Sequence, residues 1–176
     1  MNRGALARTW IKTMEKSDLD EVLLIETSSG LTSWSRQSFQ REMENALSFC
    51  FVLKGEAEEN VPITRFSSGG FSSRGSGSCE LTCGFICFRI LGEESELFNL
   101  GIHPEYRRRG LGRALVAFYL DFCDQRRVKT FYLETAVSCP STIRLYRSFG
   151  FNVLAVRPGY YKAGEDAFLM MRATPS

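Results

Sequence analysis

Glycine and arginine residues are concentrated in one short segment, residues 100–113, which reads Leu-Gly-Ile-His-Pro-Glu-Tyr-Arg-Arg-Arg-Gly-Leu-Gly-Arg. A strand-like stretch is followed by an Arg-rich turn, and then Gly110 and Gly112 open a predicted helix. Glycines let backbone N–H groups approach a phosphate closely, a helix N-terminus carries partial positive charge, and arginines add charge-assisted hydrogen bonds. The segment therefore predicts a phosphate-binding site, although the same residues could form a solvated basic turn before a surface helix.

The residues after the glycines decide between two other phosphate-binding motifs. A Walker loop needs Lys followed by Ser or Thr after its second Gly, and here Arg113 and Ala114 follow Gly112, which excludes it. A dinucleotide fingerprint needs a small residue where Leu115 stands, and its glycines directly follow the strand, whereas residues 103–109 intervene here. That second interpretation is weak.

The segment resembles the signature of the GCN5-related N-acetyltransferase (GNAT) superfamily, in which Arg or Gln, two residues, Gly, one residue and Gly or Ala follow one another. Arg107, Gly110 and Gly112 match it. The resemblance implies that acetyl-coenzyme A is the co-substrate, with its pyrophosphate on the loop's backbone amides and its pantetheine arm along the preceding strand. The residues it places at the cofactor are Leu100, Gly101, Ile102, Arg107, Arg108, Arg109, Gly110, Leu111, Gly112 and Arg113.

Downstream segments are similar to one branch of this superfamily, the ribosomal-protein-alanine N-acetyltransferases (RimI type). Residues 131–134, 143–146 and 149–151 carry this similarity, and other segments occur in the branch's order, namely 34–35, 97–99, 158–161 and 165–167. The resemblance spans about residues 14–172 and implies that the acceptor is a protein N-terminus, the Ala of a small-subunit ribosomal protein. An α-amino group, with a pKa of about 8, loses its proton more easily near neutrality than Lys at about 10.4.

Glu134 and Tyr146 are the candidate catalytic residues. Acetyl transfer from a thioester needs a neutral amine, a polarised carbonyl and a proton for the departing thiolate. Glu134, near the end of an apolar strand, could accept the ammonium proton, and Tyr146 could donate its phenolic proton to the sulfur. The non-catalytic alternatives are an ion-paired rim carboxylate for Glu134 and a core aromatic for Tyr146.

Aromatic residues are the candidates for the acceptor channel. Trp34, Tyr160 and Tyr161 could line it as the family's tyrosines do, and ordinary packing is the alternative. A backbone N–H near Ile102 is the expected donor to the thioester oxygen, because a strand that separates at a bulge exposes an unpaired amide. His103 is a weaker candidate base, since it lies on the cofactor side of the predicted site.

Cys139 is the main departure from the family pattern, which usually has Asn five residues after the catalytic Glu. In relatives that Asn contacts the pantetheine arm, so the resemblance places Cys139 at the cofactor. A thiol cannot reproduce an amide's paired donor and acceptor. We expect the contact to be lost, or replaced by Ser138 or Ser141.

Two other function classes stay open. The same fold could acetylate an internal Lys, a polyamine or an aminoglycoside, whose positive charges favour an acidic pocket. Glu93, Glu94 and Glu96 are clustered, but we interpret them as a solvated turn. The chain could also be a catalytically silent domain that binds acetyl-coenzyme A and regulates a partner, which the presence of both Glu134 and Tyr146 disfavours.

The composition is that of one soluble globular domain spanning residues 1–176. Of the 176 residues, 44% are hydrophobic and 24% charged, and 22 Lys and Arg against 20 Asp and Glu leave a net charge of +2. This balance disfavours direct nucleic-acid binding, which needs a dense basic face. Residues 67–78 are almost entirely Ser and Gly, and we expect a flexible loop within the domain.

Membrane insertion, secretion and metal binding are not expected. Apolar runs are far shorter than the roughly 20 residues that a bilayer requires, and charges near the N-terminus interrupt any signal-peptide core. We therefore expect a cytoplasmic protein whose cysteines are mostly buried, reduced thiols. With His103 as the only histidine, a zinc site is not expected.

Hydrophobic periodicity predicts strands and helices in alternation. We expect strands at 8–15, 49–53, 82–90, 96–102, 130–135, 151–157 and 166–171, and helices after Ser17, at 35–47, at 110–124 and from Pro140. Acidic residues 56–60 are expected to form a turn. Single helices inserted between strands predict a three-layer α/β or α+β fold around a mixed sheet. The GNAT resemblance implies a mostly antiparallel sheet with helices on both faces.

Overall fold

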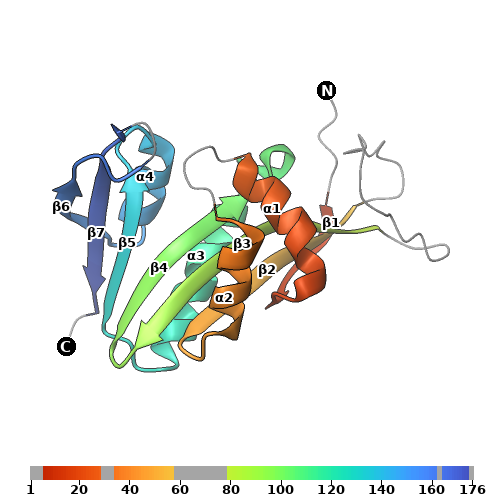
Figure 1. Ribbon diagram of the computed structural model, residues 1–176, viewed down its shortest axis with the longest axis horizontal. Coiled ribbons are helices and arrows are strands. Elements are labelled where there is room, and N and C mark those ends of the chain that lie inside the picture. The colour runs from red at the N-terminus through yellow and green to blue at the C-terminus, as the bar shows by residue number, and fades with distance from the viewer. Residues whose placement is uncertain (1–5, 29–33, 58–78, 162–163, 175–176) are drawn as a thin grey trace.

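A mixed β-sheet forms the centre of the molecule (Figure 1). The computed structural model describes residues 6–28, 34–57, 79–161 and 164–174. In this part of the chain the sheet has seven strands in the order β1-β2-β3-β4-β5-β7-β6. The strands are β1 (Leu6–Thr13), β2 (Ser48–Ala57), β3 (Cys79–Leu91), β4 (Glu94–Ile102), β5 (Thr130–Ala136), β6 (Asn152–Arg157) and β7 (Ala167–Ala173).

Helices cover both faces of the sheet, which confirms the predicted fold class (Figure 1). They are α1 (Leu19–Thr27), α2 (Arg36–Glu44), α3 (Leu111–Asp124) and α4 (Pro140–Arg147), with short 3₁₀ turns η1 (Lys16–Asp18) and η2 (Pro104–Tyr106). The apolar sides of α1 and α2 pack with Phe85 and Cys87 of β3 in one core cluster. Leu115 and Tyr119 of α3 pack with Phe88 and Leu133 in a second cluster. Each face of the sheet thus has its own hydrophobic core.

The two halves of the sheet join only where β4 meets β5. All other neighbouring strands are antiparallel, but β4 and β5 run parallel and pair only over residues 94–97 and 130–133. Beyond these residues the two strands separate, as Figure 1 shows. We call this point of separation the fork. It leaves backbone groups on both strands without a neighbouring strand.

Several predicted element boundaries were wrong. Glu56 belongs to β2 rather than to a turn, because it pairs with Arg8 of β1 and Glu80 of β3. The second helix ends at Glu44, since Asn45 has an extended backbone conformation. Ser17 does not cap the first helix; it lies within the 3₁₀ turn η1, which directly precedes α1 and begins with a capping box of Glu15 and Asp18. Most of the predicted turn at 56–60 and all of the Ser/Gly segment at 67–78 lie outside the described residues.

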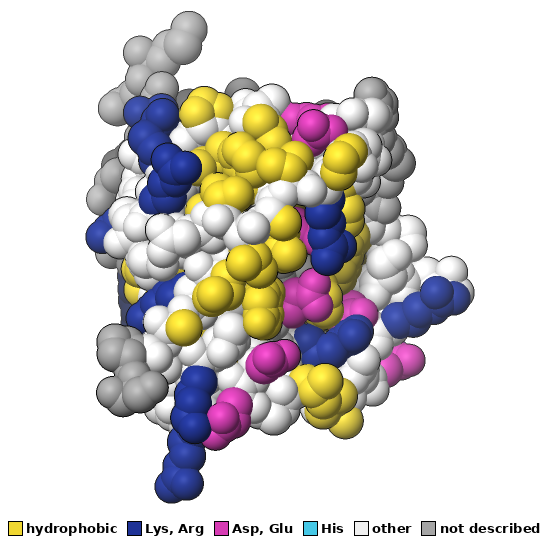
Figure 2. All heavy atoms as spheres, turned by 90° about the vertical axis from the view of Figure 1, so that its left-hand side faces the viewer, with side chains coloured by type: hydrophobic (Ala, Val, Ile, Leu, Met, Phe, Trp, Pro, Cys, Tyr) yellow, Lys and Arg dark blue, Asp and Glu magenta, His cyan; other side chains and the backbone are white. Residues whose placement is uncertain are grey.

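Strand β6 forms the outer edge of the sheet and is exposed along its whole length. Its aliphatic side chains Val153, Leu154 and Val156 contribute to the apolar surface visible in Figure 2. The strand ends at Arg157, beside the fork. Its position in the sheet therefore brings a cationic side chain close to the end of β5.

Five of the cysteine side chains are described, and all five carry free thiols. They are Cys50, Cys83, Cys87 and Cys123, which are buried, and Cys139, which is half-buried. The described His, Cys, Asp and Glu side chains form no group that could hold a metal ion. Among the described helices, none is long and apolar enough to cross a membrane.

Candidate active site

A cavity of about 410 Å³ lies where β4 and β5 separate. This volume is within the usual range of small-molecule sites. Residues from β4, the turn before α3, the end of β5 and helix α4 meet around it. Its lining is formed by Leu97, Phe98, Asn99, Leu100, Gly101, Ile102, Tyr106, Arg107, Arg108, Gly110, Leu111, Gly112, Glu134, Thr135, Ala136, Cys139, Ser141, Thr142, Leu145, Tyr146 and Tyr161.

The N-terminus of α3 forms one end of this cavity. Gly110 is the N-cap residue and has a φ of 81°, a left-handed conformation that glycine adopts without steric cost. Gly112, in the first turn of the helix, faces Leu145, and an added Cβ would lie at ordinary contact distances. Free N–H groups and the helix dipole are directed to this end of the cavity, which suits an anion.

The predicted cofactor arginines divide into two groups. Arg107 and Arg108 line the cavity. Arg107 also donates from Nε to the carbonyl oxygen of Ile102 at 3.0 Å and from Nη2 to the hydroxyl of Ser28 at 3.2 Å, so its guanidinium ties the loop to β4 and α1.

Arg109 and Arg113 do not line the cavity. Arg109 donates to the carbonyl of Glu105 and lies over the ring of Tyr106. Arg113 donates to the hydroxyl of Ser148 at 2.9 Å and lies over Phe149. Their expected contact with the cofactor stays a prediction.

Backbone N–H groups of β4 face the fork. The N–H of His103 donates to the carbonyl of Cys83 in β3 at 2.9 Å. Successive residues of an antiparallel strand direct their N–H groups to opposite edges, so the N–H groups of Leu100 and Ile102 point away from β3, toward the side that β5 has left. The bulge that accompanies this separation lies at Phe98, which precedes Ile102 in the chain, whereas we expected it near Ile102.

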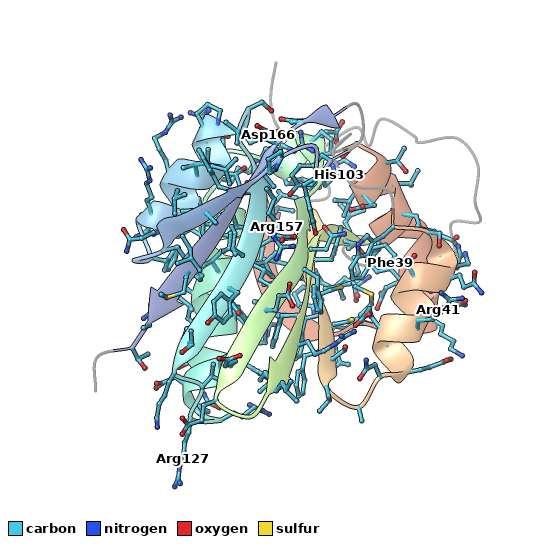
Figure 3. All side chains as sticks on the ribbon, turned by 60° about the vertical axis from the view of Figure 1, so that its left-hand side comes forward. Phe39, Arg41, His103, Arg127, Arg157 and Asp166 are labelled. Atoms are coloured by element: carbon cyan, nitrogen blue, oxygen red, sulfur yellow. The ribbon has the colours of Figure 1, made fainter. Side chains whose placement is uncertain are left out.

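Glu134 is the first residue of β5 beyond its last pairing partner in β4. Its side chain is only 11% exposed, and its Oε1 atom lies 2.7 Å from Nη1 of Arg157. Figure 3 labels Arg157 near the region where β4 and β5 separate. That oxygen is buried, and among the described residues none donates an aligned hydrogen bond to it. The catalytic interpretation predicts the burial, and the structural alternative predicts the ion pair; the structure contains both.

Tyr146 faces the cavity from α4. Its side chain is 5% exposed and packs against Phe151. Burial raises the pKa of the Tyr146 phenol, so the hydroxyl keeps its proton throughout the pH range in which proteins are stable. A protonated phenol in a cavity can act as a hydrogen-bond donor, and packing on Phe151 makes it a core residue as well.

Cys139 lines the cavity at the N-cap of α4. Of the two serines that could replace the family's Asn, Ser141 lines the cavity, whereas Ser138 donates to the carboxylate of Glu165. The structure therefore favours Ser141 as the side chain that takes over the missing polar contact.

The three aromatic residues predicted for the acceptor channel differ in how they relate to the cavity. Tyr161 lines the cavity and packs against Tyr160. Burial, followed by the hydrogen bond and charge of Glu134, raises the pKa of Tyr160 to about 12. Trp34 does not line the cavity but contacts Phe98, which does.

Sequence reasoning missed three polar residues. Arg157 pairs with Glu134, and the buried Glu26 of α1 accepts a hydrogen bond from Asn99. A carboxylate among the apolar positions of α1 was the available signal for Glu26. Glu96 lies in β4, as the predicted strand at 96–102 has it, and is exposed, as expected. Desolvation together with the charge of Glu134 raises the pKa of Glu96.

Comparisons with known proteins identify this arrangement. The acetyltransferase (GNAT) family matches residues 34–151. The [ribosomal protein bS18]-alanine N-acetyltransferase of Escherichia coli K12 is 30% identical over 91% of this chain and 94% of its own length.

Solved structures agree with the family match. The crystal structure of the ribosomal-protein-S18-alanine N-acetyltransferase from E. coli superposes with a TM-score of 0.73 and 28% identity, covering 96% of both chains. Arabidopsis thaliana NAA60 in complex with acetyl-CoA shares the fold at a TM-score of 0.70 and 18% identity, covering 94% of this chain and 98% of its own. The protein is therefore an N-acetyltransferase that belongs to the GNAT family.

Proposed function

We propose that the protein transfers the acetyl group of acetyl-coenzyme A to the N-terminal α-amino group of a protein, the N-terminal Ala of a small-subunit ribosomal protein. One observation carries the proposal: a single cavity joins an anion-binding helix N-terminus to Glu134 and Tyr146. The acceptor is inferred from the bS18-alanine acetyltransferase, whose sequence matches nearly the whole chain.

The residues around the cavity fit the parts of acetyl-coenzyme A. The N-terminus of α3, with Gly110 and Arg108, would hold the pyrophosphate. The outward N–H groups of Leu100 and Ile102 would donate to the pantetheine amides and to the thioester oxygen. Cys139 and Ser141 would contact the same arm from α4. When bound, the co-substrate supplies an activated acetyl group.

Glu134 is the proposed general base. Its buried Oε1 atom has no aligned donor among the described residues, so it can accept the ammonium proton of an acceptor directly or through a water molecule. Arg157 balances the charge of Glu134 when no amine is bound. The guanidinium must yield to the incoming cation, because both require the same carboxylate.

Tyr146 is the proposed general acid. Its phenol is buried and protonated, and it lines the same cavity as Glu134, from α4. From there it can donate a proton to the departing sulfur. Trp34, Tyr160 and Tyr161 would guide the acceptor, and Tyr160 lies within hydrogen-bonding reach of Glu134.

The position of Glu96 favours a second candidate acceptor. Two carboxylates close enough to affect each other, Glu96 and Glu134, would attract a polyamine or a Lys side chain. The positive charge of Arg157 acts in the opposite direction and lowers the pKa of Glu96. The same positive charge offsets part of the attraction that the two carboxylates exert on a cationic acceptor.

A peptide panel tests the proposal. Purified protein is supplied with labelled acetyl-coenzyme A and one acceptor at a time: peptides beginning with Ala, the same peptides with a blocked N-terminus and an internal Lys, or spermidine. We expect turnover with free N-terminal Ala and little with the other acceptors. Equal or faster turnover of spermidine or of blocked Lys peptides would move the protein to the second candidate.

A further inference from the structure

Glu26 of α1 is a buried carboxylate that connects the two sides of the site. Its side chain is 2% exposed. Its Oε2 atom accepts a hydrogen bond from Nδ2 of Asn99 in β4 at 3.0 Å, and Oε1 accepts from the backbone N–H of Trp34 at 3.1 Å. Asn99 lines the cavity, and Trp34 packs against the cavity residue Phe98. One side chain thus touches the cofactor strand and the acceptor side together.

The contact with Asn99 occurs at the bulge of β4. The register of β4 against β3 shifts between Leu97 and Asn99, so Phe98 is the extra residue. Phe98 and Asn99 both contact groups on the α1 and α2 side of the sheet, whereas Leu97 and Leu100 pack in the α3 core. The bulge therefore decides which residues of β4 face the cavity and which way the N–H of Leu100 points.

Both side-chain oxygens of Glu26 act as hydrogen-bond acceptors. Removing a carboxylate from water costs several kcal/mol unless hydrogen bonds compensate the cost. A carboxylate on the buried face of a helix is therefore expected to have partners such as these two donors. Gln has the same shape, but its amide has one accepting oxygen and one donating nitrogen. In Glu26→Gln, the Nδ2 of Asn99 would face a donor unless the Asn99 amide turns over, which would exchange the oxygen and the nitrogen that Asn99 presents to the cavity.

We propose that Glu26 is a positioning residue for acetyl transfer: it holds the bulge of β4 and the start of the acceptor side in the relative position that the reaction needs. The inference rests on the proposed function for its kinetic effect. The inference also predicts a change in the structure of β4 that can be measured without an acceptor, so the positioning role and the proposed function can fail separately.

An isosteric exchange of the two hydrogen-bonding groups tests the inference. In Glu26→Gln either two donors meet or the Asn99 amide turns over, and both outcomes disturb the wild-type contact; in Asn99→Asp two carboxylates meet. In the double variant the amide introduced at position 26 can donate to the carboxylate introduced at position 99, while its oxygen still accepts from the N–H of Trp34. We expect kcat to fall about 10- to 100-fold in Glu26→Gln, the range for a displaced catalytic geometry, with acetyl-coenzyme A affinity changed less than kcat. The double variant should recover most of the loss.

Hydrogen–deuterium exchange supplies the readout that does not depend on an acceptor. Amide exchange in residues 97–102 should rise in Glu26→Gln and return toward the wild-type rate in the double variant. Asp18→Asn is the matched control, because Asp18 is another buried carboxylate, paired with Lys54 away from the cavity. It should lower the melting temperature without lowering kcat at a temperature where it is folded.

The outcomes separate the inference from the proposed function. Wild-type exchange at 97–102 in Glu26→Gln, or a double variant no better than the single variants, would overturn the positioning role. If the wild-type protein acetylates no peptide but exchange rises and recovers as described, the proposed acceptor is wrong and Glu26 still holds the bulge. If Asp18→Asn lowers kcat as much as Glu26→Gln, the effect of Glu26 is general destabilisation.

Discussion

Gly110 offers the most direct test of where the pyrophosphate binds. A side chain at this position meets no other atom within 4 Å, so space does not restrict it. The φ of 81° restricts the choice of residue, because most L-residues lose about 1–2 kcal/mol in a left-handed conformation. Asn and Asp tolerate this conformation better than other residues. Gly110→Asn and Gly110→Asp therefore have similar backbone cost and shape, and differ mainly in one negative charge.

The charge difference can be turned into an expected affinity ratio. For an Asp carboxylate about 6 Å from a phosphate charge, Coulomb repulsion is about 0.7 kcal/mol at the dielectric constant of water and about 2.8 kcal/mol at an effective value of 20. We therefore expect Gly110→Asp to bind acetyl-coenzyme A about 3- to 100-fold more weakly than Gly110→Asn for each phosphate charge. Because Gly110 is exposed, added salt should reduce the ratio.

Titration calorimetry with three ligands measures this ratio. It should persist for dephospho-coenzyme A, which keeps the pyrophosphate, and vanish for acetyl-pantetheine, which lacks it. Equal affinities of the Asp and Asn variants for acetyl-coenzyme A would refute the reasoning, since a pyrophosphate at the N-terminus of α3 must sense a carboxylate there.

Three further predictions follow from the other side chains. Glu134→Gln should lower kcat about 10²- to 10⁴-fold, with partial recovery as pH rises toward the pKa of the amine, whereas high pH should not rescue Tyr146→Phe. Steady-state rates between pH 6 and 9 check this. If Glu134→Gln turns over at the wild-type rate, Glu134 is not the general base. Cys139→Asn should tighten acetyl-coenzyme A binding about fivefold, the effect of one hydrogen bond of about 1 kcal/mol, and unchanged calorimetric affinity would mean that the pantetheine arm does not reach this residue. Burial raises the pKa of Asp18, but the hydrogen bond and charge of Lys54 outweigh it and lower the pKa below the ordinary value; stability from this pair is present above about pH 4 and is lost as pH falls through the folded pKa. Urea unfolding between pH 5 and 2 should therefore show a smaller loss for Asp18→Asn than for the wild type, and parallel curves would contradict the pairing.

Features with a local cause could be predicted from the sequence. The helix at 111–124 starts after a glycine that the left-handed N-cap needs, and Pro140 stands in the first turn of α4, as its missing N–H and fixed φ favour. The Gly- and Arg-rich segment and the GNAT resemblance pointed to the N-terminus of α3 and to Glu134, and the structure brings both to one cavity.

Features that depend on tertiary pairing could not be predicted in the same way. Glu56 is acidic and precedes polar residues, which favours a turn, but pairing with strands on both sides keeps it in β2. Arg157 reaches Glu134 only because β6 and β7 fold back beside β5. The contacts of Arg113 with Ser148 and Phe149 also depend on tertiary packing, because they join the start of α3 to residues just after α4.

The fork explains why one short parallel pairing can create an active site. Strand edges with unpaired N–H and C=O groups favour aggregation when they lie on the surface. Here two such edges, on β4 and β5, face each other inside the molecule, covered by α1 on one side and by α3 and α4 on the other. A slender, extended ligand with amide groups, such as the proposed pantetheine arm, can enter between them and form the missing hydrogen bonds. The same separation places Glu134 directly after the last residue of β5 that pairs with β4, where its side chain lines the cavity and is only 11% exposed.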